Sequence, residues 1–212
     1  MTKSAKGINS FIAKLGLTLF IITAITALML GGVFELTKNE IAGQQMKALN
    51  KALNSLVPDG KLLEDRTYTS ESFNAYTLER SDGKLAYCLE VAPDGYGGPI
   101  NMIVGVEVAD ENGKFVKRVL GVAITRHTET PGLGSKATNE NFLSQFKEIY
   151  HLAVNENGTV NTEPSQIKIN GGGENTIDAI TGATVTSRAV AKGVMTALDS
   201  IKVSATGEVS FE

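Results

Sequence analysis

The chain has 212 residues, a formal net charge of −3 and one cysteine. A single cysteine excludes an intrachain disulfide and a cysteine-ligated iron–sulfur or zinc site, and we predict no metal site. Acidic and basic residues are mixed, without a basic patch interleaved with aromatic residues, so no nucleic-acid binding is predicted.

An uncharged segment near the N-terminus predicts a membrane anchor. Residues 15–34 carry no charge, and a helix of about 20 residues spans roughly 30 Å, the thickness of a bilayer core. A secretory signal peptide is the alternative, but its apolar region usually has about 7–15 residues, and no clear small-residue cleavage site follows. We therefore predict an uncleaved transmembrane helix at 15–34.

The charges that flank this helix predict its orientation. No acidic residue precedes it, whereas the charges that follow at 35–40 nearly cancel. Under the positive-inside rule, residues 1–14 form a cytoplasmic tail and the main domain lies on the extracytoplasmic (periplasmic) side of a single-pass inner-membrane protein. The basic residues that carry this prediction are Lys3, Lys6 and Lys14.

The rest of the chain has the pattern of an α+β fold, in which an antiparallel sheet is flanked by helices. Asn112–Gly113 is a strong hairpin signal between two apolar strand patterns. We predict a connecting segment at 35–84, helical up to Pro58 and then mixed, and one domain at 85–212. Within this domain the predicted strands are 85–92, 102–109 and 115–125, and the predicted helices are 137–149 and 187–202.

The segment His127–Gly134, with the sequence HTETPGLG, follows a predicted strand. Pro131, Gly132 and Gly134 break the strand into a tight loop that offers backbone amides and small hydroxyls at close range. A proline turn that only joins a strand to the next helix is the alternative.

The segment 178–187, with the sequence DAITGATVTS, is the most informative part of the chain. Gly182 and Ala183 leave little bulk beside Thr184, so the active site of another protein can reach this hydroxyl. The apolar positions 190, 194, 198 and 201 predict a helix immediately afterwards.

The predicted start of this helix favours a phosphate at Thr184. Thr186 or Ser187 is the expected N-cap, which puts Thr184 just ahead of the helix. Backbone N–H groups and the positive end of the helix dipole stabilise a phosphoester there, and Arg188 can add a charge-assisted bond. An ordinary turn that caps a helix is the alternative.

Asp178, two spacers and the TGAT sequence closely resemble the motif at which a flavin transferase esterifies FMN to a threonine. The family is that of the G subunit of the Rnf electron-transport complex, which is related to the C subunit of the sodium-pumping NADH:quinone reductase. The HTETPGLG segment and the YGGPI sequence at 96–100 resemble further segments of this family. The likeness covers roughly residues 88–200 and the anchor, and it departs from the family in lacking a tryptophan near Phe142.

The resemblance implies that FMN forms a phosphoester with Thr184. Tyr96 would cover one face of the flavin, although a plain hairpin turn is the alternative at that position. The other residues that the resemblance and the motif place at the cofactor are Gly182, Ala183, Thr186, Ser187, Arg188, Glu129, Thr130, Gly132 and Leu133.

The implied function is that of a membrane-anchored electron-transfer subunit of an ion-translocating ferredoxin:NAD oxidoreductase complex. No catalytic residue is predicted, because the chain has no complete active site of its own and lacks a dinucleotide fingerprint. Its implied partners are the other membrane and peripheral subunits, and a flavin transferase during maturation. The alternatives are a component like the C subunit of a sodium-pumping NADH:quinone reductase, a free-standing extracellular FMN electron carrier and an anchored binding domain without redox chemistry.

Overall fold

The computed structural model describes residues 3–70, 73–147, 149–155 and 157–212. They form two compact units, one up to Lys47 and one from Ala48 to Glu212. Met1, Thr2 and Glu148, which fall in the predicted tail and in a predicted helix, lie outside the described residues, as do the side chains of Lys3 and Lys6.

The first unit consists of most of helix α1 (Lys3–Leu56). Among the described residues, this helix alone is long and apolar enough to cross a membrane, with a mean hydropathy of 2.3 in its apolar window. Its threonine hydroxyls bond within the helix: Thr18 donates to the carbonyl of Lys14 at 2.9 Å, and Thr26 donates to that of Ile22 at 2.8 Å. Hydroxyls satisfied in this way are tolerated in a bilayer core, where water cannot bond to them.

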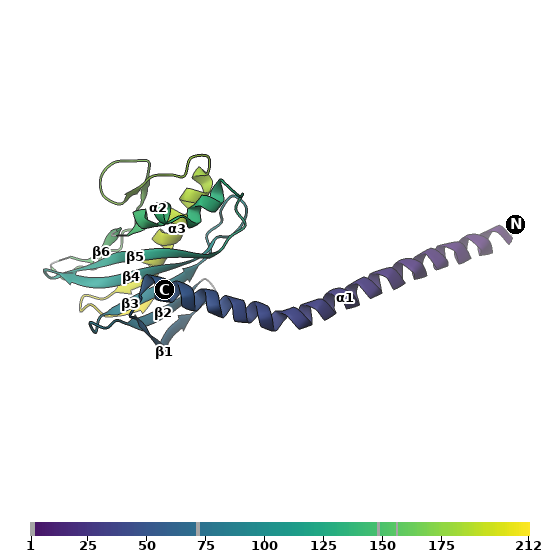
Figure 1. The fold of residues 1–212 in the computed structure, drawn as a ribbon, viewed down its shortest axis with the longest axis horizontal. Helices are drawn as coiled ribbons and strands as arrows, with labels where there is room; N and C mark the ends of the chain where they lie inside the picture. Colours follow the sequence, from purple (N-terminus) through teal and green to yellow (C-terminus); the bar gives the residue numbers. More distant parts are fainter. Residues whose placement is uncertain (1–2, 71–72, 148, 156) are drawn as a thin grey trace. The chain divides into compact units, whose positions relative to one another are not determined.

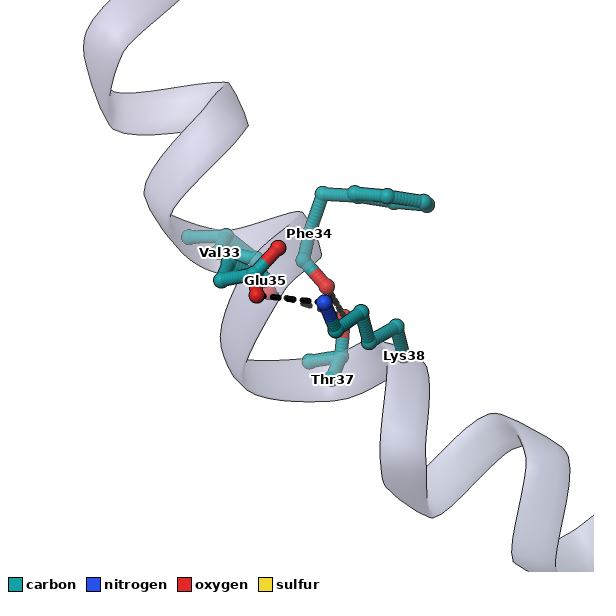
Figure 2. Close-up of polar contacts among 5 residues, drawn as sticks. All are labelled: Val33, Phe34, Glu35, Thr37 and Lys38. Carbon is teal, nitrogen blue, oxygen red and sulfur yellow. Dashed lines mark hydrogen bonds and ion pairs between the residues drawn. The ribbon is translucent and has the colours of Figure 1, made fainter.

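After Lys14, the next charged side chains on α1 come where its apolar stretch ends (Figure 2). Glu35 forms an ion pair with Lys38, one turn further along the helix. Beside this pair, the hydroxyl of Thr37 donates to the carbonyl of Val33 at 2.8 Å. The helix continues through this point without a break, so the predicted helices at 15–34 and after residue 35 are parts of one element.

The second unit is built on a six-stranded antiparallel sheet in which each strand pairs with its neighbour in sequence (Figure 1). Asn112 and Gly113 have φ values of 58° and 81°, which form the predicted hairpin turn. The predicted α+β class is confirmed. The strands are β1 (Lys61–Thr69), β2 (Asn74–Glu79), β3 (Leu85–Val91), β4 (Asn101–Glu111), β5 (Lys114–Arg126) and β6 (Tyr150–Val154).

Both faces of this sheet are covered, because side chains alternate between the faces along each strand. On β3, Ala86 and Cys88 pack with Leu53 near the end of α1, whereas Tyr87 and Leu89 pack in the core cluster that includes helix α3 (Thr184–Ser200). Figure 1 shows α2 (Glu140–Leu143) and α3 together over one face. Burial raises the pKa of the Cys88 thiol to about 12, so it is the inert core residue that its strand pattern indicates.

The predicted helix at 137–149 is wrong. The chain forms three short turns there: η1 (Gly134–Thr138), α2 and η2 (Ser144–Phe146). Asn139, at ψ 138°, is extended and separates η1 from α2, while Lys147, at ψ 140°, ends η2 before β6 begins. Phe142 and Phe146 are buried and contact each other edge-on, with 5.4 Å between their ring centroids. The packing of these two rings on the core thus holds the segment in short turns instead of one regular helix.

The remaining elements are short. β7 (Lys168–Ile169) and β8 (Thr176–Ile177) form a parallel pair in the segment that leads to α3. β9 (Ile201–Val203) and β10 (Val209–Phe211) pair after α3 and pack at the edge of the same core.

Candidate functional site

A cavity of about 480 Å³ lies where three segments of the second unit meet. The turn after β3 supplies Tyr96, the loop after β5 supplies Glu129 and its neighbours, and the start of α3 supplies Thr184 and the residues around it. The lining residues are Tyr96, Glu129, Thr130, Leu133, Gly134, Gly182, Ala183, Thr184, Val185 and Thr186.

The side chain of Glu129 joins these three segments. It is 5% exposed, and its Oε1 accepts a hydrogen bond from the backbone N–H of Gly97 at 3.0 Å. Its Oε2 accepts a hydrogen bond from the hydroxyl of Thr186 at 2.6 Å. The hydroxyl of Thr128 donates to the carbonyl of Gly97 at 2.8 Å, so the loop and the turn are joined twice.

Glycines surround this carboxylate because a Cβ would not fit. A Cβ on Gly95 would lie 2.3 Å from Glu129 Oε1, and one on Gly134 would lie 2.3 Å from Glu129 Oε2. A Cβ on Gly97 would lie 2.4 Å from the carbonyl oxygen of Thr128. Gly95, Gly97 of the YGGPI segment and Gly134 of the HTETPGLG segment therefore allow two backbones to close around one buried carboxylate.

The start of α3 differs from the predicted start. The helix begins at Thr184 with Ala183 as its N-cap, and its first bond runs from the N–H of Ser187 to the carbonyl of Ala183 at 3.0 Å. The prediction of Thr186 or Ser187 as N-cap is wrong, because the Thr186 hydroxyl is bonded to Glu129 and the Ser187 hydroxyl donates to Ala183. Thr184 is thus the first residue of the helix, and its side chain is exposed.

The segment just before the TGAT sequence is held by side chains. The backbone N–H groups of residues 178–180 each donate to a side-chain oxygen from another part of the chain. This arrangement fixes the backbone while Asp178 and Thr181 remain exposed. The three acceptors, in the order of their donors, are Gln145 at 2.7 Å, Asn170 at 2.7 Å and Ser187 at 2.9 Å.

Three of the predicted site residues do not line the cavity. Gly132 has a φ of 76° and donates its N–H to the hydroxyl of Ser135 at 2.9 Å, Ser187 is buried behind the helix start, and Arg188 is exposed. Two lining residues, Gly134 and Val185, were not predicted. Both lie inside the motifs, and the only sequence signal for Val185 is an apolar side chain between two threonines.

The cavity can hold a ligand that combines an aromatic ring with a phosphate. Its volume falls in the range of about 300–1,000 Å³ that is usual for small-molecule sites. Tyr96, Leu133 and Val185 give it exposed apolar surface, and the first N–H groups of α3 have no carbonyl one turn earlier to bond, which suits an anion. Among the described residues, no cluster of His, Cys, Asp and Glu could hold a metal ion.

A second, smaller cavity of about 190 Å³ lies at the other end of α3. Lys117 lines it, is 6% exposed, and donates from Nζ to the carbonyls of Leu198 at 2.6 Å and Ile201 at 3.2 Å. Burial lowers the pKa of Lys117 to about 8. This lysine satisfies carbonyls at the end of the helix whose beginning lines the first cavity.

Comparison with known proteins gives two family matches. Residues 95–199 match the FMN-binding domain family, and residues 1–56 match the RnfG N-terminal region. All the residues that line the larger cavity lie within the first match. The chain therefore has an FMN-binding domain behind an RnfG-type N-terminal region.

Relatives resemble most of the chain. The G subunit of an ion-translocating oxidoreductase complex from Vibrio vulnificus is 34% identical over 86% of both chains. The G subunit of a proton-translocating ferredoxin:NAD(+) oxidoreductase complex from Clostridium ljungdahlii is 30% identical over 84% of both chains. The solved C subunit of a Na(+)-translocating NADH-quinone reductase from Parabacteroides distasonis is 20% identical, covers 60% of this chain and 59% of its own, and has a TM-score of 0.44. On the two family matches and the sequence identities to the two G subunits, the chain belongs to the RnfG family, the G subunits of ion-translocating oxidoreductase complexes.

Proposed function

We propose that this chain carries FMN as a phosphoester on Thr184 and transfers electrons within an ion-translocating oxidoreductase complex. The position of Thr184 is the observation that carries the proposal. Its side chain is exposed at the first residue of α3, on the wall of the larger cavity and inside the FMN-binding domain. A hydroxyl in that position is open to an external enzyme and adjacent to the space that would hold the ring.

The attachment needs a flavin transferase as a maturation partner. In that step the Thr184 hydroxyl loses its proton and an Oγ–P bond forms, while the group bound to the FMN phosphate in the donor leaves. The helix start suits the product, because the first backbone N–H groups of α3 and the positive end of its dipole stabilise a phosphate. Arg188 lies four residues after Thr184, about one turn further along the same face of α3, and is exposed, so it can approach the phosphate from solvent.

The other cavity residues would hold the ring and exclude water. Leu133, Val185 and Tyr96 provide apolar surface on different walls, while Glu129 fixes the walls relative to one another. FMN, when bound, supplies the redox chemistry, and the protein supplies orientation and electrostatics. Gly182, at a φ of 78°, turns the chain into Thr184 where a bulkier residue would be strained.

The anchor and the relatives support a place in a membrane complex. The relatives belong to ion-translocating complexes, and one bears the ferredoxin:NAD(+) oxidoreductase name. Other membrane and peripheral subunits would therefore deliver and remove electrons. The lysines before the apolar part of α1 favour an N-terminus in the cytoplasm and the flavin on the periplasmic side.

Mass analysis of Thr184 tests the proposal. The chain is produced together with a flavin transferase, denatured in SDS, and examined for in-gel flavin fluorescence and for the mass of its tryptic peptides. We expect one FMN phosphoester on Thr184, and complete loss of fluorescence in Thr184→Ala. Thr184→Ser should still be labelled with flavin, but less than the wild type, since the hydroxyl remains while the methyl group that limits its rotation is gone.

Thr181→Ala is the matched control, because Thr181 is exposed in the same motif but outside the cavity lining. It should keep its flavin. FMN found on Thr181 or Thr186 while Thr184 stays unmodified would refute the assignment. Isolation of the flavin-bearing chain without any partner, under conditions that preserve membrane complexes, would favour the free-standing carrier.

A further inference from the structure

Glu129 is a buried carboxylate that lines the same cavity as Thr184. Burying a charge without a compensating partner is costly, so such groups are rare unless they are paired or have a function. Within the part of the chain that the structure describes, no ion pair involves Glu129. Its compensation comes from two hydrogen bonds, one from the backbone of Gly97 and one from Thr186.

Both hydrogen bonds of the Glu129 side chain suit an ionised carboxylate. Each carboxylate oxygen accepts one bond, and neither donates. An ionised carboxylate is an acceptor only, whereas the protonated form has a hydroxyl that must donate. As an ionised carboxylate, this side chain places a negative charge at the wall of the cavity, beside the partial positive charges of its two hydrogen-bond donors.

We propose that the charge of Glu129 lowers the reduction potential of the flavin bound in this cavity. This inference rests on the proposed function, because it requires FMN at Thr184. An electron added to the cavity brings negative charge close to the carboxylate, and repulsion between like charges is screened less in a buried site than in water. The Thr186 hydroxyl moderates the effect, since its donated bond offsets part of the carboxylate charge.

A merely structural role for Glu129 makes a different prediction from an electrostatic role. If Glu129 only joins the three segments, then any change that loosens them should disturb the site in the same way. If its charge matters, removing the charge and removing its hydrogen-bond donor must shift the potential in opposite directions. Two substitutions separate these cases with little change in shape.

Glu129→Gln removes the charge but keeps the size, and its amide can still accept from Gly97 and donate to the Thr186 oxygen. Thr186→Val keeps the charge and the shape of residue 186 but removes the hydroxyl donor. Glu140→Gln is the control, because Glu140 is exposed on α2 and lies outside the cavity lining. Its charge change is screened by solvent.

The experiment is a spectroelectrochemical titration of the full flavinylated chain at pH 8, after covalent flavin has been verified in each variant. For Glu129→Gln we expect at least a tenfold rise in the ratio of reduced to oxidised flavin at a fixed electrode potential, equivalent to about 30 mV for a two-electron couple. Thr186→Val should lower the ratio, and Glu140→Gln should change it less than about twofold.

An unchanged or lowered ratio in Glu129→Gln would overturn the inference, as would shifts of the same sign in Glu129→Gln and Thr186→Val. Loss of covalent flavin from both folded variants would also overturn it, because Glu129 would then serve attachment and not potential. A wild-type chain without flavin on Thr184 would instead refute the proposed function, so the two failures are distinguishable.

Discussion

The hydroxyl of Thr186 donates a hydrogen bond to Glu129 at 2.6 Å, although the two residues are 57 positions apart in the chain. This contact closes the loop after β5 onto the first turn of α3, and both residues face the larger cavity. The geometry around Thr184, the proposed acceptor, therefore depends on a segment that the sequence places far away from it.

Gly134→Ala tests how tightly that contact is packed. A Cβ at Gly134 would lie 2.3 Å from Glu129 Oε2 and 2.8 Å from Thr186 Oγ1, so the two side chains would have to separate. We expect a loss of unfolding free energy of about 1–3 kcal/mol and a marked fall in flavin labelling. Chemical unfolding and in-gel fluorescence measure the two effects.

Gly172→Ala is the control for that substitution. Its Cβ would meet no atom within 4 Å, and Gly172 does not have a positive φ. It should leave both measurements unchanged. Equal labelling in the Gly134 and Gly172 variants would mean that the Glu129–Thr186 contact does not govern the acceptor site.

Gln145→Ala tests whether the backbone before the acceptor must be held. The Gln145 side chain accepts from the N–H of Asp178 at 2.7 Å and donates to its carbonyl at 3.4 Å. Without these bonds the segment loses a fixed conformation, and ordering it again at the transferase costs conformational entropy. We expect the labelling rate at limiting transferase to fall about tenfold, with the rate at saturating transferase affected less.

Gln166 is an exposed glutamine elsewhere in the same domain, so Gln166→Ala serves as the comparison. It should label at the wild-type rate. If Gln145→Ala also labels normally at every transferase concentration, the fixed backbone has no part in recognition.

The proposed orientation of the domain rests on the charges around the apolar part of α1. Protease added to spheroplasts should remove the flavin-bearing domain, while a cytoplasmic marker protein stays intact. Replacing Lys3, Lys6 and Lys14 with Glu should reduce the digested fraction. Protection of the domain while a periplasmic marker is digested would reverse the proposed topology.

Lys117 predicts a particular dependence of stability on pH. Burial lowers its pKa from 10.5 to about 8, so between these values the unfolded chain binds more protons at this site than the folded chain does. The unfolding free energy from this group should therefore rise as the pH increases from 8 to 10.5, by on the order of 3 kcal/mol. Below pH 8 both states are protonated, and this contribution no longer changes.

Comparing the wild type with Lys117→Met isolates that contribution from other titrating groups. Chemical unfolding of both chains in detergent, at several values from pH 7 to pH 10.5, should give curves that diverge above pH 8. Parallel curves would show that the Lys117 side chain has the same proton affinity in both states.

The sequence predicted the parts of the fold that local patterns determine. β3, β4 and β5 and the Asn112–Gly113 turn have strong strand and hairpin signals, and they form as expected. β1 and β2 were not predicted, and β1 is exposed along most of its length, so it lacks the alternation of a half-buried strand. The predicted domain boundary at 85 falls between β2 and β3 of one sheet.

The wrong prediction of the N-cap of α3 has a physical cause. The hydroxyl of Thr186 was expected to cap α3, but it bonds to Glu129, which no local pattern reveals. The three sequence motifs that supply Tyr96, Glu129 and Thr184 do meet at one cavity. Residue types identified these motifs, whereas the contacts between them depend on how β3, β5 and α3 pack.

The order of the strands sets an order of events during synthesis. The six strands of the sheet all precede α3, so the ribosome completes them before it reaches the helix that begins at Thr184. Until that helix docks, the sheet face that contains Leu89, Met102 and Val104 lacks the cover that α3 provides. One late event, the docking of α3, thus both finishes the hydrophobic core and presents Thr184. Under the proposed attachment, cofactor loading would therefore act as a checkpoint, since a chain that can be loaded would already have folded.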